Sequence, residues 1–502
     1  LAGAGASSGM AMAHWEIQGW MILILGWVFV PFYSRSMVYT MPEFLERRYN
    51  PQSRTILSVI SLVSYVLTKV AVTVYAGGLV FQQVFGIKEL WGIDFFWIAA
   101  IGLVVLTALY TIFGGMKSVL YTSVLQTPIL LLGSLIILVL GFKELGGWDE
   151  MMRVCGAVTV NDYGDTMTNL IRSNDDANFP WLGALIGSAI IGFWYWCTDQ
   201  FIVQRVLSGK NEKEARRGTI FGAYLKLLPV FLFLIPGMIA FALHQKYIGA
   251  GGEGFLPMLT NGTANADAAF PTLVAKLLPA GVKGLVVCGI LAALMSSLAS
   301  LFNSSAMLFT IDFYKRFRPE TPEKKLVGIG QIATVVIVIL GILWIPIMRS
   351  VGDVLYTYLQ DVQSVLAPGI AAAFLLGICW KRTSAQGGMW GLIAGMIIGL
   401  TRLGAKVYYS NAGEVADSTF KYLFYDMNWL FFCGWMFLFC IIVVIVVSLA
   451  TEAPTAEKIQ GLVFGTATKE QKAATRASWD HWDIIHTVII LAITGAFYWY
   501  FW

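Results

Sequence analysis

Long apolar runs recur along the 502-residue chain and constrain its fold more than any other feature. An α-helix needs roughly 20 mostly apolar residues to cross a bilayer. Twelve runs approach or exceed this length, and residues 1–12 are typical of the end of one more helix. The runs lie at 14–34, 54–86, 93–113, 118–142, 181–204, 216–243, 283–311, 326–348, 354–379, 386–403, 428–450 and 480–501. Only 13% of the residues are charged, whereas soluble domains carry about 25%. The sequence therefore predicts an all-α, polytopic membrane protein.

Lysine and arginine residues gather in alternate loops between these runs. If residues 1–12 run outward, the basic loops around Arg47, 205–217 and 315–325 all lie on the same side. Cytoplasmic loops of membrane proteins carry such an excess of positive charge. We therefore expect these loops to be cytoplasmic and the polar segment 143–180 to be extracellular.

Several other classes of protein are not indicated. The four histidines lack the paired spacing of a zinc site, and we find no nucleophile–base pair, P-loop or HExxH pattern, so no enzyme is predicted. The six cysteines fall mostly in or beside apolar runs, which argues against a disulfide framework. The net charge of +4 does not indicate a nucleic-acid partner, because the basic residues lie in short loops. The expected partners are the lipid bilayer and a small solute.

Four residues within or beside the runs are candidates for solute binding, because polar groups in a membrane are costly and often functional. They are Glu16, Tyr195, Lys226 and Gln360. A carboxylate, an ammonium and an amide offer hydrogen bonds to a hydroxylated solute, and an aromatic ring suits the C–H face of a sugar. Each also has a structural interpretation. These are an interfacial carboxylate for Glu16, aromatic packing for Tyr195, a side chain that reaches the cytoplasmic interface for Lys226, and helix-to-helix bonding for Gln360.

Lys69 and Asp199 are two further charged residues within the runs. Asp199 lies near the cytoplasmic end of its run, and we expect it to pair with Arg205 or Arg217. For Lys69 we favour a structural role.

The segment ALMSSLASLFNSS, residues 293–305, places hydroxyl and amide groups inside an apolar run. Ser296, Ser300, Asn303 and Ser304 fall at i, i+4, i+7 and i+8, which is one face of a helix. One interpretation is a small-residue interface whose hydroxyls bond back to the helix backbone. The other is a site for an alkali cation, since hydroxyl and carbonyl oxygens suit such an ion better than zinc or copper. A second, interrupted helix would complete that site.

The run YTIFGGMKS, residues 110–118, resembles the signature of the sodium:solute symporter family. The segments TMPEFLERRYN, WYWCTDQFIVQR, GAYLKLLPVF, AALMSSLASLFNSS and AAAFLLGICWKR resemble its sodium/glucose cotransporter branch, and they cover nearly the whole chain in order. The resemblance implies an inverted-repeat fold similar to that of amino-acid transporters, with two five-helix repeats and two helices broken at the midplane.

The resemblance also implies how the chain divides. We expect one transporter domain over 1–502, in which 1–142 is the remainder of the first repeat, 181–379 is the second repeat, and 386–502 contains additional helices. The first helix of the family and half of the next are expected to precede Leu1.

Residue roles follow from the same resemblance. Ala293 would contribute a carbonyl oxygen, and Ser296 and Ser297 would contribute hydroxyls, to the main sodium site. The sugar would bind at five positions. Glu16, Lys226 and Gln360 would bond its hydroxyls, Tyr195 would close the pocket toward the cytoplasm, and Gly192 stands where relatives carry an Asn or Thr that touches the sugar.

The function that the resemblance implies is secondary active transport across the plasma membrane. Inward sodium flow would drive uptake of a neutral monosaccharide of the glucose or galactose type by alternating access. Members that couple two sodium ions carry an Asp at the position of Ser123 and a hydroxyl at the position of Ala299, so we expect one sodium per sugar. The alternatives are symport of myo-inositol, another polyol or another solute, and a sugar-gated channel or sensor on the same fold.

Overall fold

The structure is a computed structural model that describes residues 1–36, 38, 40–259, 262–351, 354–411 and 416–502. Within these ranges, side chains are described for all residues except 110, 112–123, 125 and 348–351. The family-like run 110–118 and Ser123 therefore lie outside the described side chains, apart from Thr111.

Helices form nearly all of the regular structure. The first half of the chain contains α1 Ala2–Ser8, η1 Gly9–Met12, α2 Ala13–Glu16, α3 Gly19–Ile24, η2 Leu25–Phe29, α4 Val30–Ser36, α5 Met41–Arg48, α6 Pro51–Ser64, η3 Tyr65–Val70, α7 Ala71–Phe85, β1 Glu89–Leu90, β2 Ile93–Asp94, α8 Phe95–Leu145, α9 Trp148–Gly156, α10 Trp181–Gly192, η4 Phe193–Thr198, α11 Gln200–Leu207, α12 Glu212–Pro229, η5 Val230–Leu234 and α13 Ile235–Gly249. β1 and β2 form a short antiparallel hairpin.

The second half is helical throughout its described elements. It contains η6 Ala266–Ala268, α14 Ala269–Leu277, α15 Ala280–Met307, η7 Leu308–Tyr314, α16 Lys315–Phe317, α17 Glu323–Val351, α18 Leu355–Cys379, α19 Ala385–Asn411, α20 Thr419–Lys421, η8 Tyr422–Asp426, α21 Trp429–Ala450, η9 Ala456–Lys458, α22 Lys469–Ala477 and α23 His481–Tyr500.

The described residues include 11 helical segments long and apolar enough to cross a membrane, and a shorter apolar helical stretch at Phe95–Leu109. Together they match the twelve runs of the sequence. The run 118–142 corresponds to the span Gln126–Leu145, which shares the 51-residue helix α8 with Phe95–Leu109. Residues 1–12 contain the separate short helix α1, whose C-cap is Gly9 with a φ of +65°, and the 3₁₀ turn η1. Both belong to the first candidate span, Ala2–Ser36.

Local sequence signals set where several spans begin. The Asn50 side chain accepts a hydrogen bond from the Ser53 amide at 2.8 Å, and Pro51 occupies the first helical position of α6. Such a cap satisfies an N–H that the helix cannot bond itself, and Pro at this position loses no hydrogen bond. The Asp94 side chain caps α8 in the same way.

Short π-helical segments interrupt several spans, among them η3, η4, η5 and η7. Pro229 explains η5, since it has no N–H to donate and frees a carbonyl one turn earlier. Such segments are frequent at functional sites. Lys69 lies on η3 and Tyr195 on η4, so two of the residues singled out in the sequence occupy them.

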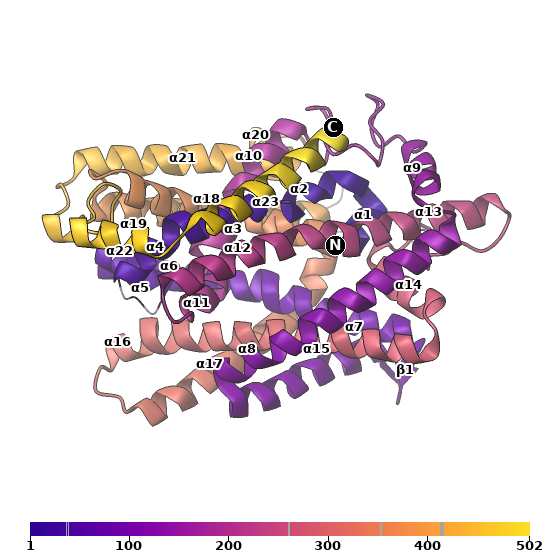
Figure 1. Cartoon of the computed structure of the whole chain (residues 1–502), viewed down its shortest axis with the longest axis horizontal. Helices are drawn as coiled ribbons and strands as arrows, with labels where there is room; N and C mark the ends of the chain where they lie inside the picture. Colours follow the sequence, from indigo (N-terminus) through magenta and orange to yellow (C-terminus); the bar gives the residue numbers. More distant parts are fainter. Residues whose placement is uncertain (37, 39, 260–261, 352–353, 412–415) are drawn as a thin grey trace.

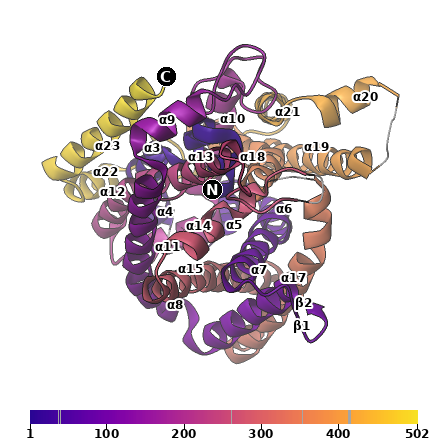
Figure 2. The same ribbon diagram turned by 90° about the vertical axis from the view of Figure 1, so that its right-hand side faces the viewer.

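The spans lie side by side along the long axis of the molecule (Figure 1), with α23 at the edge of the bundle (Figure 2). α18 is the most enclosed of the candidate spans. In its most apolar stretch 83% of the residues are buried, compared with 22% in α23. α18 packs against α19 and α21, and Gly369 of α18 approaches Gly395 of α19 so closely that a Cβ on Gly369 would lie 2.9 Å from the Gly395 Cα.

The small residues at the start of the chain allow close helix packing, as their pattern suggests. A Cβ on Gly5 of α1 would lie 2.2 Å from the Leu234 carbonyl oxygen. A Cβ on Gly237 of α13 would lie 2.0 Å from the carbonyl oxygen of Ala2. The two backbones therefore meet at a distance that a larger residue would prevent.

Arg48, at the end of α5, binds the C-terminal end of α18. Its buried guanidinium donates to the carbonyl oxygens of Gly377 at 2.6 Å, Thr383 at 3.1 Å and Trp380 at 3.2 Å. A cation at a helix C-terminus is favourable, because it satisfies carbonyls that lack partners in the helix.

We expect Arg48→Met to lower the melting temperature of the protein in detergent, because it removes a charged donor from three carbonyl oxygens at and just beyond the end of α18. Hydrogen bonds to a charged group contribute about 1.5–3 kcal/mol each, so the loss should be among the largest of any single substitution. Arg153→Met is the matched control, since that side chain is 70% exposed. Equal melting temperatures for the two variants would contradict this role of Arg48.

Candidate functional site

A cavity of about 180 Å³ opens among α2, α10, η4, α12 and α18. It is smaller than the roughly 300–1,000 Å³ pockets that hold drug-sized ligands, which suits a compact polar solute. Its lining residues are Trp15, Glu16, Gln18, Ile191, Gly192, Tyr195, Trp196, Lys226, Tyr356, Leu359, Gln360 and Gln363. All five positions expected to bind the sugar are on this list, although they come from four separate segments of the chain.

A break between α2 and α3 forms one wall of the cavity. α2 ends at Glu16, and the chain resumes as a helix at Gly19. Glu16 and Gln18 flank Ile17 at this break and both line the cavity. Another wall includes η4, whose wider π turn presents Tyr195 and Trp196 in succession.

Glu16 and Lys226 form an ion pair at the cavity. Lys226 Nζ lies 2.5 Å from Glu16 Oε2, and their side chains are 14% and 6% exposed. The Tyr356 hydroxyl donates to the other carboxylate oxygen of Glu16, and Lys226 Nζ lies 5.4 Å from the centroid of the Trp196 ring. These contacts decide against an interfacial position for Glu16 and against a Lys226 side chain that extends to the cytoplasmic interface. The pair leaves the cavity polar but without net charge.

Two buried polar atoms of the cavity residues have no hydrogen-bond partner among the described residues. They are Trp15 Nε1, which is a donor, and Gln360 Oε1, which is an acceptor. Buried polar groups in proteins are nearly always paired, so such atoms call for an explanation. A bound solute with several hydroxyls would supply a partner to both.

Gln18, Tyr356 and Gln363 are cavity residues that the sequence reasoning missed. Gln363 carried a signal, because it follows Gln360 by three residues and so lies on the same face of α18. Gln18 lies two residues after Glu16, at the break between α2 and α3, where helical spacing gives no guide.

Asp199 pairs with Lys69, which corrects the expectation that it would pair with Arg205 or Arg217. Its carboxylate also accepts from the Tyr65 hydroxyl at 3.0 Å. Both arginines are engaged elsewhere. Arg205 donates to Ser300, and Arg217 is 2.7 Å from Asp480 and 3.1 Å from Asp483.

The Lys69 ammonium is enclosed by aromatic rings as well as by Asp199. Lys69 Nζ lies 4.3 Å from the ring centroid of Phe201, 4.6 Å from that of Tyr65 and 5.1 Å from that of Tyr195. Aromatic faces stabilise a desolvated cation. This arrangement fits the structural role expected for Lys69, and it connects the residue to one wall of the cavity through Tyr195.

The three residues expected to bind sodium lie on α15. Ala293 is half-buried, Ser296 is buried and Ser297 is exposed. Consecutive residues of a helix differ by about 100° in direction, so Ser296 and Ser297 face different neighbours. The positions form one compact segment of α15, and their role as ligands remains an expectation.

The inner part of the same hydroxyl-rich face contacts α11. Gln204 Nε2 donates to the Ser304 hydroxyl, and Arg205 donates to the Ser300 hydroxyl. The Ser304 hydroxyl donates in turn to the Ser300 carbonyl at 2.9 Å. Helix packing, the first interpretation of the serine stripe, therefore applies at Ser300 and Ser304, and the cation site stays a prediction.

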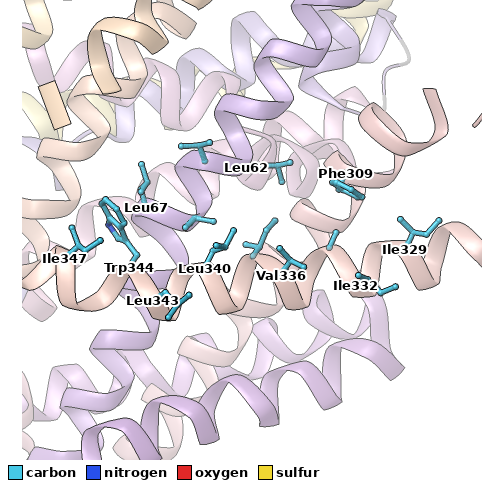
Figure 3. Close-up of a pocket in the computed structure, with 14 residues that line it drawn as sticks. Leu62, Leu67, Phe309, Ile329, Ile332, Val336, Leu340, Leu343, Trp344 and Ile347 are labelled. Carbon is cyan, nitrogen blue, oxygen red and sulfur yellow. The ribbon is translucent and has the colours of Figure 1, made fainter. Parts of the chain in front are cut away.

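A larger cavity of about 570 Å³ lies away from these residues, between α17 on one side and α6, η3 and η7 on the other (Figure 3). Its lining is apolar, and Ile332 and Leu343 of α17 are more than 60% exposed. These residues belong to the span Glu323–Ile347, so they face the lipid. A hydroxylated solute would find almost no hydrogen-bond partners there, so we assign no solute site to it.

Comparison with known proteins shows the family of the chain. The model of the family described as "Sodium:solute symporter family" matches residues 1–395. The chain belongs to this family.

Its relatives are cotransporters that carry the names of sugars and polyols. The chain is 35% identical over 479 residues to the Homo sapiens sodium/myo-inositol cotransporter 2, covering 93% of this chain and 70% of the relative. It is 34% identical over 497 residues to the Danio rerio sodium/glucose cotransporter 4, covering 95% and 74%. It is 36% identical over 508 residues to the Bos taurus sodium/mannose cotransporter, covering 96% and 83%.

The fold is similar to that of a solved Na⁺-coupled sialic acid symporter in a substrate-bound, outward-open state. The TM-score is 0.65 at 20% identity, and the match covers 90% of this chain and 86% of the other. The all-α inverted-repeat fold expected from the sequence is thereby confirmed. The protein is a multi-pass plasma-membrane transporter that couples solute movement to sodium, and it is not an enzyme.

We expect Lys226→Met to destabilise this symporter, because it leaves the Glu16 carboxylate buried without its cation. Breaking a buried ion pair from one side costs about 3–5 kcal/mol, whereas replacing both partners by apolar groups is often close to neutral. The double variant Glu16→Leu with Lys226→Met should therefore recover much of the melting temperature. Both variants should lose the rise in melting temperature that a bound solute produces in the unchanged protein. An unaltered melting temperature for Lys226→Met would show that the pair does not stabilise the fold.

Proposed function

We propose that the protein couples inward sodium flow to uptake of a neutral, polyhydroxylated solute by alternating access. The solute is a monosaccharide of the glucose or galactose type, or a cyclic polyol such as myo-inositol. The observation that carries the proposal is the cavity where Glu16, Gly192, Tyr195, Lys226 and Gln360 meet.

The charge of the cavity favours a neutral solute. Glu16 neutralises Lys226, so no net charge remains to hold a carboxylate or an amine. The polar groups around the pair are amides, phenols and indole N–H groups, which together donate and accept hydrogen bonds. A ring with several hydroxyls matches that mixture, because each hydroxyl can do both.

The relatives support both a hexose and a cyclitol as the solute. Those at about 35% identity include proteins named for myo-inositol, glucose and mannose. All of these solutes present a ring of hydroxyls of similar size. The proposal therefore commits to this class, and the uptake experiment below separates its members.

Sodium coupling follows from a shift in conformational populations. Sodium that binds the outward-open state better than the inward-open state raises the fraction of protein ready to bind solute. The membrane potential contributes roughly 2.3 kcal/mol per elementary charge per 100 mV, and the sodium gradient adds to this. In the proposal the ion binds to oxygen atoms of Ala293, Ser296 and Ser297 on α15. These ligands carry no strong charge, so they hold the ion weakly enough to release it.

We propose one sodium ion per solute. Ala299 lacks the hydroxyl that a second site would use, and it is fully buried, with its carbonyl oxygen accepting from Asn303 Nδ2 at 3.0 Å. The Ala299 carbonyl oxygen is therefore already used in a hydrogen bond within α15.

Tracer uptake into proteoliposomes tests the function. With an inward sodium gradient, at least one of glucose, galactose, mannose and myo-inositol should rise above its equilibrium level inside the vesicles, and a potassium gradient should give no such overshoot. The charge that enters per solute should be close to one. Sodium-dependent binding without accumulation would identify a sensor or channel, and a ratio near two would contradict the single ion.

Two substitutions separate the ion from the solute. Ser297→Ala should raise the sodium concentration needed for half-maximal uptake, because one proposed oxygen ligand is lost, while solute affinity at saturating sodium stays close to normal. Gln360→Ala should weaken solute affinity by about tenfold, the equivalent of one hydrogen bond of ~1.4 kcal/mol, while sodium activation is unchanged. The assignment fails if each substitution shifts both curves equally.

A further inference from the structure

Gly192 leaves a gap in the wall of the cavity, and the side chain of Gln18 fills it. A Cβ built on Gly192 would lie 2.5 Å from Gln18 Oε1, 3.0 Å from its Cδ and 3.2 Å from its Nε2. These are the atoms of one amide group, and all of them are closer than an ordinary van der Waals contact. Any side chain at position 192 would compete with this amide for the same space.

The Gln18 amide is held in place and does not fill the gap by chance. The residue is only 2% exposed, and Gln18 Nε2 donates to the Ser188 carbonyl oxygen at 2.8 Å. Ser188 lies one helical turn before Gly192 on α10. Gln18 can leave the gap only by giving up this hydrogen bond, which is costly for a buried amide.

This hydrogen bond also fixes which atom of the amide is the acceptor. Only the NH₂ group can donate to a carbonyl, so it is the nitrogen that faces Ser188. The oxygen therefore lies beside Gly192, and both residues line the cavity.

We propose that Gln18 is a specificity-determining residue whose amide takes the place of a side chain at position 192 and whose Oε1 accepts a hydrogen bond from one solute hydroxyl. This inference rests on the proposed function and adds to it. The cavity selects solutes with a hydroxyl donor directed at Gln18, and its wall at α10 is set by the amide and by the absence of a side chain at Gly192.

A series of deoxy analogues tests the hydrogen bond. The parent compound is the solute that the unchanged protein accumulates best, and each analogue lacks one hydroxyl. Gln18→Leu keeps a similar volume and removes the acceptor, so the apparent affinity for the parent should fall about tenfold. For the single analogue that lacks the hydroxyl facing Gln18, the unchanged protein and Gln18→Leu should bind equally well. The sodium dependence should be the same in both proteins.

A pair of substitutions tests whether the Gln18 amide occupies the space of a side chain at position 192. Gly192→Ala should lower both solute affinity and melting temperature, because the added methyl group displaces the Gln18 amide. Gln18→Ala with Gly192→Ala should bring the melting temperature back toward that of Gln18→Ala alone. The matched control is Gly218→Ala on α12, where a Cβ would meet no atom within 4 Å and no loss is expected.

Failure of the inference and failure of the proposed function give different results. If the unchanged protein accumulates one of the solutes but Gln18→Leu weakens every deoxy analogue equally, or weakens none, only the role of Gln18 is overturned. If Gly192→Ala lowers solute affinity and melting temperature no more than Gly218→Ala does, the claim that the Gln18 amide occupies this space is overturned. If the unchanged protein accumulates none of the solutes, the proposed function falls and the inference falls with it.

Discussion

The ion pair between Glu16 and Lys226 is the interaction on which the candidate site depends. The two residues are 210 positions apart in the sequence and belong to different spans. Neither charge is tolerable alone at membrane depth, so each fixes the place of the other. Tyr356 adds α18 to the same contact through its bond to Glu16. One paired charge thus brings together α2, α12 and α18 and leaves between them a polar space without net charge.

A second buried ion pair lies beside the first and shares a wall with it. η4 presents two neighbouring aromatic residues, Tyr195 and Trp196, and each faces a different ammonium. Tyr195 lies next to Lys69, which is paired with Asp199, and Trp196 lies next to Lys226. The π-helical segment is therefore held between two ion pairs. A displacement of η4 relative to Lys69 or Lys226 would loosen the corresponding cation–π contact, which connects both ion pairs to this wall of the cavity.

The sequence predicted the spans and most of the candidate site, because both depend on local or family-level signals. Apolar runs of the required length mark membrane helices wherever they occur, and the resemblance placed Glu16, Lys226 and Gln360 in one site that the cavity brings together. The partner of Asp199 was not predictable in this way. Lys69 lies 130 residues away, and the helices that bring them together can be recognised only from packing.

Gln18 was missed, and the partners of the serine stripe were not predicted, for related reasons. Gln18 sits where the helix breaks, so no helical spacing assigned it to a face, and Gly192 gave no sign that another residue occupied its space. The stripe on α15 was read as one surface, yet Ser300 and Ser304 serve contacts with α11 that depend on tertiary structure.

The most direct test of the account is a density map, by cryo-electron microscopy, of the protein with saturating sodium and the solute that it accumulates. The account predicts density for the solute between Glu16, Lys226 and Gln360, with one hydroxyl within hydrogen-bonding distance of Gln18. Solute density elsewhere, for example in the larger apolar cavity beside α17, with no density between Glu16, Lys226 and Gln360, would contradict it.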